Sequence, residues 1–449
     1  MTNPTTIDSG PALLGAYQAA EEIRTGRLSS EELVRACLAR IEQTEPTVQA
    51  WTFLDAELAV AQAKRADVLK MTGQPLGPLH GVPVGIKDVF DTMDMPTEDG
   101  TILHRGRTPG QDATVVSKLR QAGAVIMGKT VTTELAVYAP GKTRNPHDPE
   151  RTPGGSSSGS AAAVAAGMVP LAVGTQTNGS MIRPASYCGV YGYKPTYGLI
   201  SRHRVLQQSR PLDQVGVFAR SIEDIALIAE AIIGYDPLDP DTLLRARPHL
   251  LRLQAEAPPV TPKLALVKTP VWDQAAETTR EAFAELAGAL GEQAVEVDLP
   301  PLFDQAHELH GRIMEADLAR SFATEYDRGK DQLSQVLAAM IERGRRVLAT
   351  EYNDAVAAIP VLRQELERLF QWHDAIITPA AVGEAPLGLE STGSPIFCTI
   401  WTLCGLPAIT VPLLQGENGM PLGVQLVGPP GDDAALLRTA RWLVQTITE

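Results

Sequence analysis

The sequence predicts an α/β protein in which a β-sheet is covered by helices on both faces. Short apolar runs bounded by Gly and Pro are typical of buried strands, and they alternate along the chain with longer segments of helical periodicity. Hydrophobic residues make up 44% and charged residues 20% of the 449 positions. This composition is typical of a globular protein, and the chain is long enough to bury a large core.

The overall composition argues against several classes of protein. The formal net charge of −14 argues against nucleic-acid binding and gives no reason to expect an anionic membrane as a partner. No run of 18 uncharged apolar residues occurs, and residues 1–15 lack the basic and apolar segments of a signal peptide. No C-x-x-C pair occurs, so we expect a cytoplasmic protein whose cysteines are reduced core residues: Cys37, Cys188, Cys398 and Cys404.

The N-terminal region, residues 1–75, is predicted to be helical. Ser29 and Glu32 form a capping-box pattern, and apolar residues recur on one helix face after them. We expect Pro46 to end this helix. A second, Ala-rich helix is predicted over residues 55–71.

Strands and helices alternate in residues 76–220. The apolar run at 82–86 predicts a buried strand that leads to the charged residue Lys87. We expect two further strands, at 124–127 and 169–173, and three helices, at 112–122, 130–138 and 161–166.

The C-terminal half is predicted to be largely helical. Residues 235–262 are rich in Pro, Asp and Arg and are interpreted as an excursion, with an amphipathic piece near 243–253. Turn residues 416–419 between two apolar runs indicate a β-hairpin. The other predicted elements are strands at 264–267 and 375–377, surface helices at 277–290, 303–326 and 333–358, and a last helix capped by Asp432 or Asp433.

Two loops rich in Gly and Ser, residues 154–160 and 174–180, bring hydroxyls and free amides together and suit acyl-transfer chemistry. Residues 155–159 match the G-x-S-x-G pattern of a nucleophile elbow, which requires a preceding strand. Residues 146–153 are instead polar and contain three prolines, so an elbow is disfavoured. A phosphate-binding P-loop is also disfavoured, because no Lys follows Gly159.

His307 and His310 have i, i+3 spacing on a predicted helix, but no third metal ligand is evident. We therefore expect a solvated helix face rather than a metal site. Lys87 has two interpretations: a buried ammonium whose pKa falls until it can act as a base, or an exposed lysine paired with Asp88 or Asp91.

The loop that ends at Ser180 also has two interpretations. Successive amides in such a turn can point together and hold a developing oxyanion, or the turn can be a simple connection between elements.

Many ordered segments of the chain together resemble the amidase signature family, most densely from about 76 to 218. The segments are Gly81-Val-Pro-Val-Gly-Ile-Lys87-Asp88, Gly128-Lys-Thr130, Thr152-Pro-Gly-Gly-Ser-Ser-Ser-Gly-Ser160, Gly174-Thr-Gln-Thr-Asn-Gly-Ser180, residues 184–196, Leu212-Asp-Gln-Val-Gly216 and Gly405-Leu-Pro-Ala-Ile-Thr-Val-Pro412. The resemblance implies a single domain with one large mixed twisted β-sheet flanked by helices on both faces. It assigns helices to 1–75, the catalytic core to 76–220, a variable substrate-side region to 235–380 and a completing hairpin and helix to 381–449.

The resemblance also implies a Ser–cis-Ser–Lys triad that needs no metal and no cofactor. In the family the nucleophile follows the bridging Ser by 24 positions, which selects Ser156 as the bridge and Ser180 as the nucleophile, with Lys87 as the base. The peptide bond between Gly155 and Ser156 is then expected to be cis. The N–H groups that would hold the oxyanion are those of Thr177, Asn178, Gly179 and Ser180.

The nucleophile loop departs from the commonest family pattern, Asp-x-Gly-Gly-Ser-Ile-Arg. Gln176 replaces the Asp, Asn178 replaces the first Gly, and Arg183 stands three residues after Ser180 rather than two. This variant resembles malonamidase-type members. Arg183 is interpreted either as a ligand for a substrate carboxylate or as one half of a buried ion pair that fastens the loop. Asn178 is expected either to narrow the oxyanion region or to add a donor.

The expected activity is hydrolysis of a small linear, carboxylate-bearing amide to acid and ammonia or amine through a Ser180 acyl-enzyme. Phe397 and Trp401 are candidate pocket-wall residues, although each is more often a core residue. The alternatives are the glutaminase A subunit of a tRNA-dependent amidotransferase and a non-catalytic binding or scaffold member of the fold. We expect a homodimer, and a small accessory subunit is left open.

Overall fold

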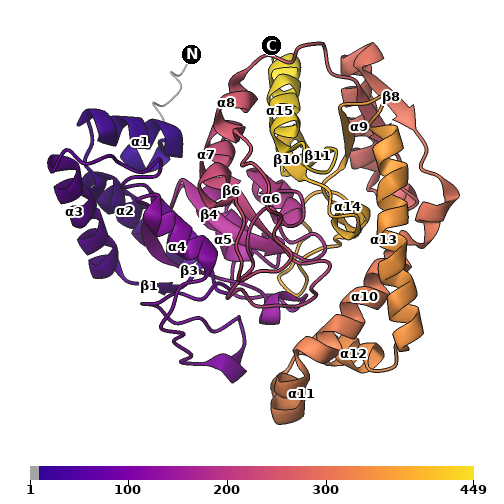
Figure 1. Cartoon of the computed structure of the whole chain (residues 1–449), viewed down its shortest axis with the longest axis horizontal. Helices are drawn as coiled ribbons and strands as arrows, with labels where there is room; N and C mark the ends of the chain where they lie inside the picture. Colours follow the sequence, from indigo (N-terminus) through magenta and orange to yellow (C-terminus); the bar gives the residue numbers. More distant parts are fainter. Residues whose placement is uncertain (1–9, 449) are drawn as a thin grey trace.

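The computed structural model describes residues 10–448, and an 11-stranded sheet runs through the middle of the molecule (Figure 1). The strand order is β1-β3-β2-β4-β6-β5-β10-β11-β9-β7-β8. Pairs β2–β3, β2–β4, β7–β8 and β7–β9 are parallel and the others are antiparallel, so the expected large mixed sheet is confirmed. The strands are β1 Trp51–Leu54, β2 Pro83–Lys87, β3 Val125–Thr130, β4 Leu171–Gln176, β5 Tyr191–Lys194, β6 Gln214–Ala219, β7 Leu264–Val267, β8 Ala294–Val297, β9 Ala375–Pro379, β10 Ala408–Gln415 and β11 Pro421–Val427.

Helices flank both faces of this sheet. Side chains alternate between the faces along β4: Leu171 and Val173 pack in one apolar cluster and Ala172 in another. The helices are α1 Ala16–Thr25, α2 Ser30–Val48, α3 Ala56–Met71, α4 Thr114–Gln121, α5 Ser158–Ala165, α6 Ile182–Cys188, α7 Ile222–Ile232, α8 Leu250–Ala255, α9 Glu277–Leu290, α10 Ala306–Ser321, α11 Ala323–Gly329, α12 Gln335–Gly344, α13 Ala349–Leu369, α14 Thr399–Leu403 and α15 Asp433–Thr448.

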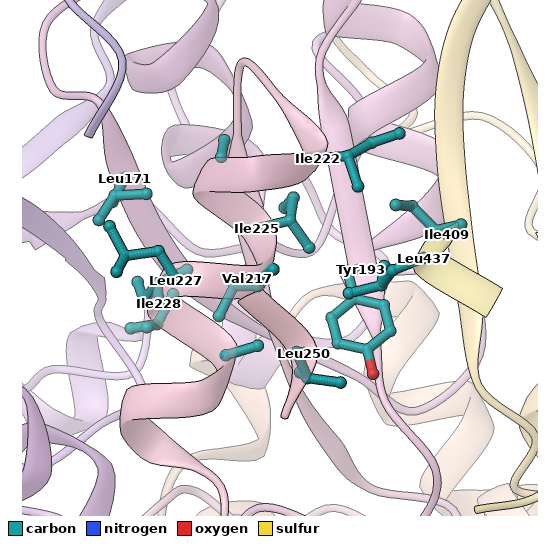
Figure 2. Packing of buried hydrophobic residues seen from close by; sticks show 14 of the residues in the cluster. Leu171, Tyr193, Val217, Ile222, Ile225, Leu227, Ile228, Leu250, Ile409 and Leu437 are labelled. Atoms are coloured by element: carbon teal, nitrogen blue, oxygen red, sulfur yellow. The ribbon is translucent and has the colours of Figure 1, made fainter. Parts of the chain in front are cut away.

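The largest apolar cluster lies between helix α7 and the centre of the sheet (Figure 2). Ile225 and Ile228 of α7 pack with Val217 of β6 in this cluster, and all three side chains are fully buried. A second cluster joins α10, α13 and α14 to β9 and β11, and it contains Trp401. Phe397 lies in a small cluster of its own with Val271. Both aromatic residues are therefore core residues.

Most of the predicted elements begin and end near the expected positions, and helix α2 shows why. The sequence did not predict β1, β5, β6, β8 or α7, and the helices expected at 303–326 and 333–358 are each divided into two. Ser29 accepts a hydrogen bond from the N–H of Glu32, and the Glu32 carboxylate accepts one from the N–H of Ser29, so the capping box is confirmed. Pro46 does not end the helix. It lies in the last turn, where its missing N–H costs only one hydrogen bond, and Gln49 in the left-handed conformation ends α2.

The helix predicted over 130–138 is wrong. Strand β3 continues to Thr130, and only a short 3-10 turn follows at Glu134–Ala136. Leu135 and Ala136 have φ values of 45° and 57°, which an α-helix excludes. The Gln208 side-chain amide donates hydrogen bonds to both of their carbonyl oxygens, at 3.1 and 2.6 Å, and so holds this turn.

Other expectations concern the cysteines, the C-terminal hairpin and the termini. All four cysteines are buried and free, and β10 pairs with β11 as the predicted hairpin. Within residues 10–448, no helix combines the length and the apolar character that crossing a membrane demands. Most of residues 1–15, where no signal peptide is expected, lies outside the described residues.

Candidate active site

Lys87 ends strand β2 in the interior of the sheet, between β3 and β4, and its side chain is fully buried. Its Nζ lies 2.7 Å from the Ser156 Oγ and 2.7 Å from the Thr175 Oγ1. Burial lowers the pKa of Lys87 well below its ordinary value, and the carboxylate of Asp213 opposes that shift only in part. The interpretation of Lys87 as an exposed, paired lysine is therefore wrong.

The carboxylates that were candidates to pair with Lys87 pair with other residues. The Lys129 Nζ lies 3.0 Å from the Asp88 Oδ1, and the Arg107 Nη1 lies 2.8 Å from the Asp91 Oδ1. Lys87 therefore has only hydroxyl groups as side-chain hydrogen-bond partners within residues 10–448.

Ser156 is held by the loop that leads into helix α5. The Gly155–Ser156 peptide bond is cis, as the family resemblance implied. The Ser156 carbonyl accepts a hydrogen bond from the N–H of Thr133, and a Cβ on Gly154 would lie 2.8 Å from the backbone of Pro184. The neighbouring Ser157 points elsewhere, because its Oγ donates to the Thr175 carbonyl at 3.1 Å and so fastens the loop to β4.

Ser180 lies in the loop between β4 and α6 and is 8% exposed. Its Oγ makes no hydrogen bond to any described residue, whereas Lys87 and Ser156 contact each other directly. Parallel pairing of β2 with β4 brings the end of β4 beside Lys87, as the contact from Lys87 to Thr175 shows. The structure thus brings the ends of these two strands and the Ser156 loop to one edge of the sheet.

The side chains of Gln176 and Asn178 both make hydrogen bonds that hold the loop. The Gln176 Oε1 accepts from the N–H groups of Met181 and Ile182, at 2.7 and 3.0 Å. The Asn178 Nδ2 donates to the Tyr138 hydroxyl at 3.1 Å, and its Oδ1 accepts from the Thr399 hydroxyl at 2.8 Å. The Asn178 NH2 group carries two hydrogens and the Tyr138 contact uses one of them, so the expectation that Asn178 adds a donor stays a prediction.

Several backbone N–H groups of the loop, unlike the side chains of Gln176 and Asn178, lack hydrogen-bond partners among the described residues. Four successive backbone N–H groups of the loop have no hydrogen-bond acceptor among residues 10–448. They are those of Thr177, Asn178, Gly179 and Ser180. Most buried backbone donors in proteins are paired, so free donors at residues 177–180 can serve an acceptor atom of a bound molecule. They are the same four groups that the family resemblance assigns to an oxyanion.

Arg183 is fully buried in helix α6. Its Nη2 donates to the Gly155 carbonyl at 2.6 Å and to the Thr392 Oγ1 at 3.1 Å. No carboxylate within residues 10–448 forms an ion pair with it, so the buried ion pair considered above is wrong, although a hydrogen bond does fasten the Gly155 loop. Its Nε and Nη1 have no partner among the described residues, and burial lowers the pKa of its guanidinium.

His310 departs most from the expectation of a solvated helix face. It is fully buried on α10, and its Nε2 lies 2.9 Å from the Thr177 carbonyl oxygen. His307 is partly buried, and its Nε2 lies 3.0 Å from the carbonyl oxygen of Ile396. Burial lowers the pKa of His310 to about 4, so its ring is neutral near pH 7.

Sequence reasoning also missed Thr175 and Asp213. Asp213 is buried and accepts hydrogen bonds from the Thr177 hydroxyl at 2.7 Å and from the N–H groups of Gln208 and Ser209, at 2.8 and 3.0 Å. Burial raises its pKa to about 6. Asp213 lies within a segment that resembles the family, so a signal existed there, whereas no local pattern marks His310.

Two cavities flank the nucleophile loop. One of about 410 Å³ is lined by Thr175, Thr177 and Asp213, together with several arginines. The other, of about 350 Å³, is lined by Asn178 and His310, together with residues of α10, α12 and the 394–399 segment. Each cavity is large enough for a small organic molecule.

Comparison with known proteins gives consistent matches over nearly the whole chain. Residues 32–437 match the family model described as Amidase. The glutamyl-tRNA(Gln) amidotransferase A subunit of Rhodopirellula baltica is 33% identical over 485 aligned positions, which cover 95% of each chain. The protein of the same name from Anaeromyxobacter sp. strain K is 36% identical over 481 positions, which cover 96% of this chain and 95% of the relative.

A solved structure also matches over nearly the whole chain. It is an inhibitor-bound chain from a "vestigial protein complex" that "reveals the evolutionary origins of an s-triazine catabolic enzyme". Its TM-score is 0.90 at 30% identity, over 96% of this chain and 98% of that chain.

Proposed function

Because the chain belongs to the amidase signature family, we propose that it hydrolyses a small linear, carboxylate-bearing amide through an acyl-enzyme on Ser180. The products are an acid and ammonia or an amine. The chain is an amide-cleaving hydrolase by its family and relatives, and the proposal concerns its substrate class and the roles of its residues.

The proposed first step is attack by Ser180. The lowered pKa of Lys87 leaves a neutral amine, whose lone pair can accept the Ser156 hydroxyl proton over the 2.7 Å contact. Ser156 in turn accepts the proton of Ser180, and the Ser180 Oγ forms a bond to the amide carbon. The carbonyl π electrons move to oxygen, where the free N–H groups of residues 177–180 stabilise the negative charge.

Collapse of this intermediate breaks the C–N bond. The proton held by Lys87 returns through Ser156 to the departing nitrogen, which leaves as ammonia or an amine. Water then attacks the ester carbon and loses its proton by the same relay, and Ser180 recovers its proton as the acid departs. All protons are therefore accounted for without a metal or a cofactor.

One observation supports a carboxylate on the substrate: the guanidinium of Arg183 is buried and has no counter-ion among the described residues. A buried charge is costly unless it is paired, and Arg183 has two nitrogens without partners beside the Ser156 loop. A substrate carboxylate would supply the missing charge and accept two hydrogen bonds from the planar guanidinium. The likeness of the loop to malonamidase-type members remains a prediction.

The test is a pair of substrates that differ at one end, where one has a carboxylate and the other a methyl group. Succinamate and butyramide have the same carbon chain, and only succinamate carries a carboxylate. Arg183→Met should lower kcat/KM for succinamate at least tenfold more than for butyramide. Arg65→Met, an exposed arginine on α3, is the control and should leave both unchanged. Equal losses on both substrates would assign Arg183 to loop fastening alone.

A second function is favoured by the curated relatives, which are named as components of a tRNA-dependent amidotransferase at 33% and 36% identity. Such a glutaminase role would use the same residues, because glutamine also carries a carboxylate. The two proposals differ in their partners. A small-amide hydrolase should turn over succinamate as an isolated chain or homodimer, whereas an amidotransferase component should hydrolyse glutamine efficiently only when its partner chains are present. The departures at Gln176 and Asn178 favour the first proposal.

A further inference from the structure

Two carbonyl groups of the nucleophile loop accept hydrogen bonds from side chains, whereas the N–H groups of residues 177–180 have no acceptor among the described residues. The Thr177 carbonyl oxygen lies 2.9 Å from the His310 Nε2. The Asn178 carbonyl accepts a hydrogen bond from the Thr402 hydroxyl at 2.5 Å. His310 belongs to α10 and Thr402 to α14, so both contacts come from far along the chain.

Peptide geometry gives these two contacts a consequence for the oxyanion site. In a trans peptide unit the C=O and the N–H point in opposite directions. The carbonyl of Thr177 shares its unit with the N–H of Asn178, and the carbonyl of Asn178 shares its unit with the N–H of Gly179. A side chain that holds either carbonyl therefore directs the following N–H to the opposite side.

We propose that His310 and Thr402 are positioning residues that aim the N–H groups of Asn178 and Gly179 at the oxygen of the reacting amide. This inference rests on the proposed function, since it requires an oxyanion at the loop. In this role each residue acts through a backbone carbonyl.

The protonation state of each group suits this role. A carbonyl oxygen can only accept a hydrogen bond, so the His310 Nε2 must carry the proton, and the ring stays neutral because burial lowers its pKa to about 4. The single hydroxyl proton of Thr402 goes to the Asn178 carbonyl, and its oxygen accepts from the Gln176 Nε2 at 2.9 Å.

This arrangement also explains the departure at position 176. Gln176 donates to Thr402 through Nε2 while its Oε1 accepts from Met181 and Ile182. An ionised Asp could accept but could not donate, so it would leave Thr402 without this orienting contact. Gln176, Thr402 and Asn178 therefore form one directed chain of hydrogen bonds.

The test makes two variants at each of these positions, one that removes the hydrogen-bond donor and one that keeps it. His310→Leu removes the donor, whereas His310→Gln keeps an N–H at the same number of bonds from Cβ. Thr402→Val removes the hydroxyl, and Thr402→Ser keeps it. Thr143→Val is a matched control, because the buried Thr143 hydroxyl donates to the Gln49 carbonyl at 2.8 Å and makes no hydrogen bond to residues 174–180.

We expect His310→Leu and Thr402→Val to lower kcat by about 10- to 100-fold with KM within about threefold, since losing a whole oxyanion donor costs about 10²- to 10³-fold. His310→Gln and Thr402→Ser should restore kcat to within about fivefold of the unmodified chain. Thr143→Val should lower the Tm by a similar amount to Thr402→Val while kcat stays unchanged. If His310→Leu does not fold, the comparison of Thr402→Val with Thr402→Ser tests the proposal by itself.

Three results would overturn the positioning role. They are an unchanged kcat in Thr402→Val, an effect of that variant on KM alone, and a loss of kcat that Thr402→Ser does not restore. Ser180→Ala in the same assay separates this inference from the function on which it rests. If Ser180→Ala stays active, the proposed function fails. If Ser180→Ala is inactive while the donor variants turn over normally, only the positioning role fails.

Discussion

Two buried lysines lie on neighbouring strands, and they have different hydrogen-bond and ion-pair partners. Lys87 at the end of β2 meets two hydroxyl groups, whereas Lys129 near the end of β3 meets the Asp88 carboxylate, two backbone carbonyls and the Thr97 hydroxyl. Burial lowers the pKa of both, but nearby carboxylates, Asp88 foremost, offset the shift at Lys129. With equal burial, only Lys129 has an adjacent carboxylate, which suits Lys87 to the proposed role of base and Lys129 to that of a structural cation.

The largest expected effect separates the two lysines by activity. Lys87→Met should lower turnover by about 10³- to 10⁴-fold, because it removes the proposed base, while the chain stays folded. Lys129→Met leaves the Asp88 carboxylate buried without its cation, so its main defect should be in stability. Turnover of succinamate and the urea midpoint, measured for both variants, check this contrast. Equal activity losses in two folded variants would contradict it.

The next effect concerns stability alone. Asp88→Asn should lower the free energy of unfolding by about 3 kcal/mol, because it leaves the Lys129 ammonium buried without an opposite charge. Urea unfolding measures this loss. The double variant with Asp88→Asn and Lys129→Met should be more stable than Asp88→Asn alone, since it buries no charge at this site. A double variant that is less stable than both single variants would argue against a structural ion pair.

The smallest effect concerns the pH dependence. Only neutral Lys87 is active, so kcat/KM should rise with pH as Lys87 loses its proton. The negative charge of Asp213 favours protonated Lys87 and raises its pKa, so Asp213→Asn should move this acidic limb to lower pH, by about one unit. The pH–rate profile of succinamate hydrolysis measures the shift. A limb that moves to higher pH would exclude Lys87 as its source.

Local patterns in the sequence predicted the parts of the molecule that local chemistry determines. The apolar strand before Lys87 and the capping box at Ser29 are built from neighbouring residues, and both were predicted correctly. The burial of Lys87 was left open by the sequence, because a lysine at the end of an apolar strand can be buried or exposed, and the structure decides for a strand whose five residues are all buried. The roles of Ser156 and Ser180 came from resemblance and remain proposals.

Contacts between distant segments account for what could not be predicted. The turn at Leu135 is held by Gln208, some 70 positions further along the chain, so residues 130–138 look helical by periodicity and are not. His310 is buried because α10 packs against the nucleophile loop, and nothing in its own helix indicates that contact. The unpaired state of Arg183 depends on which carboxylates the fold brings near, and no sequence pattern reports that.

The central claim is that Ser180 carries the acyl group, and an acid-quenched turnover experiment tests it most directly. A p-nitrophenyl ester that bears a carboxylate should acylate faster than it deacylates, so the acyl-enzyme should accumulate. Mass spectrometry of the digested protein should find the acyl mass on the peptide that contains Ser180, and Ser180→Ala should abolish it. An acyl group on Ser156 or Ser157, or labelling that survives Ser180→Ala, would contradict the account.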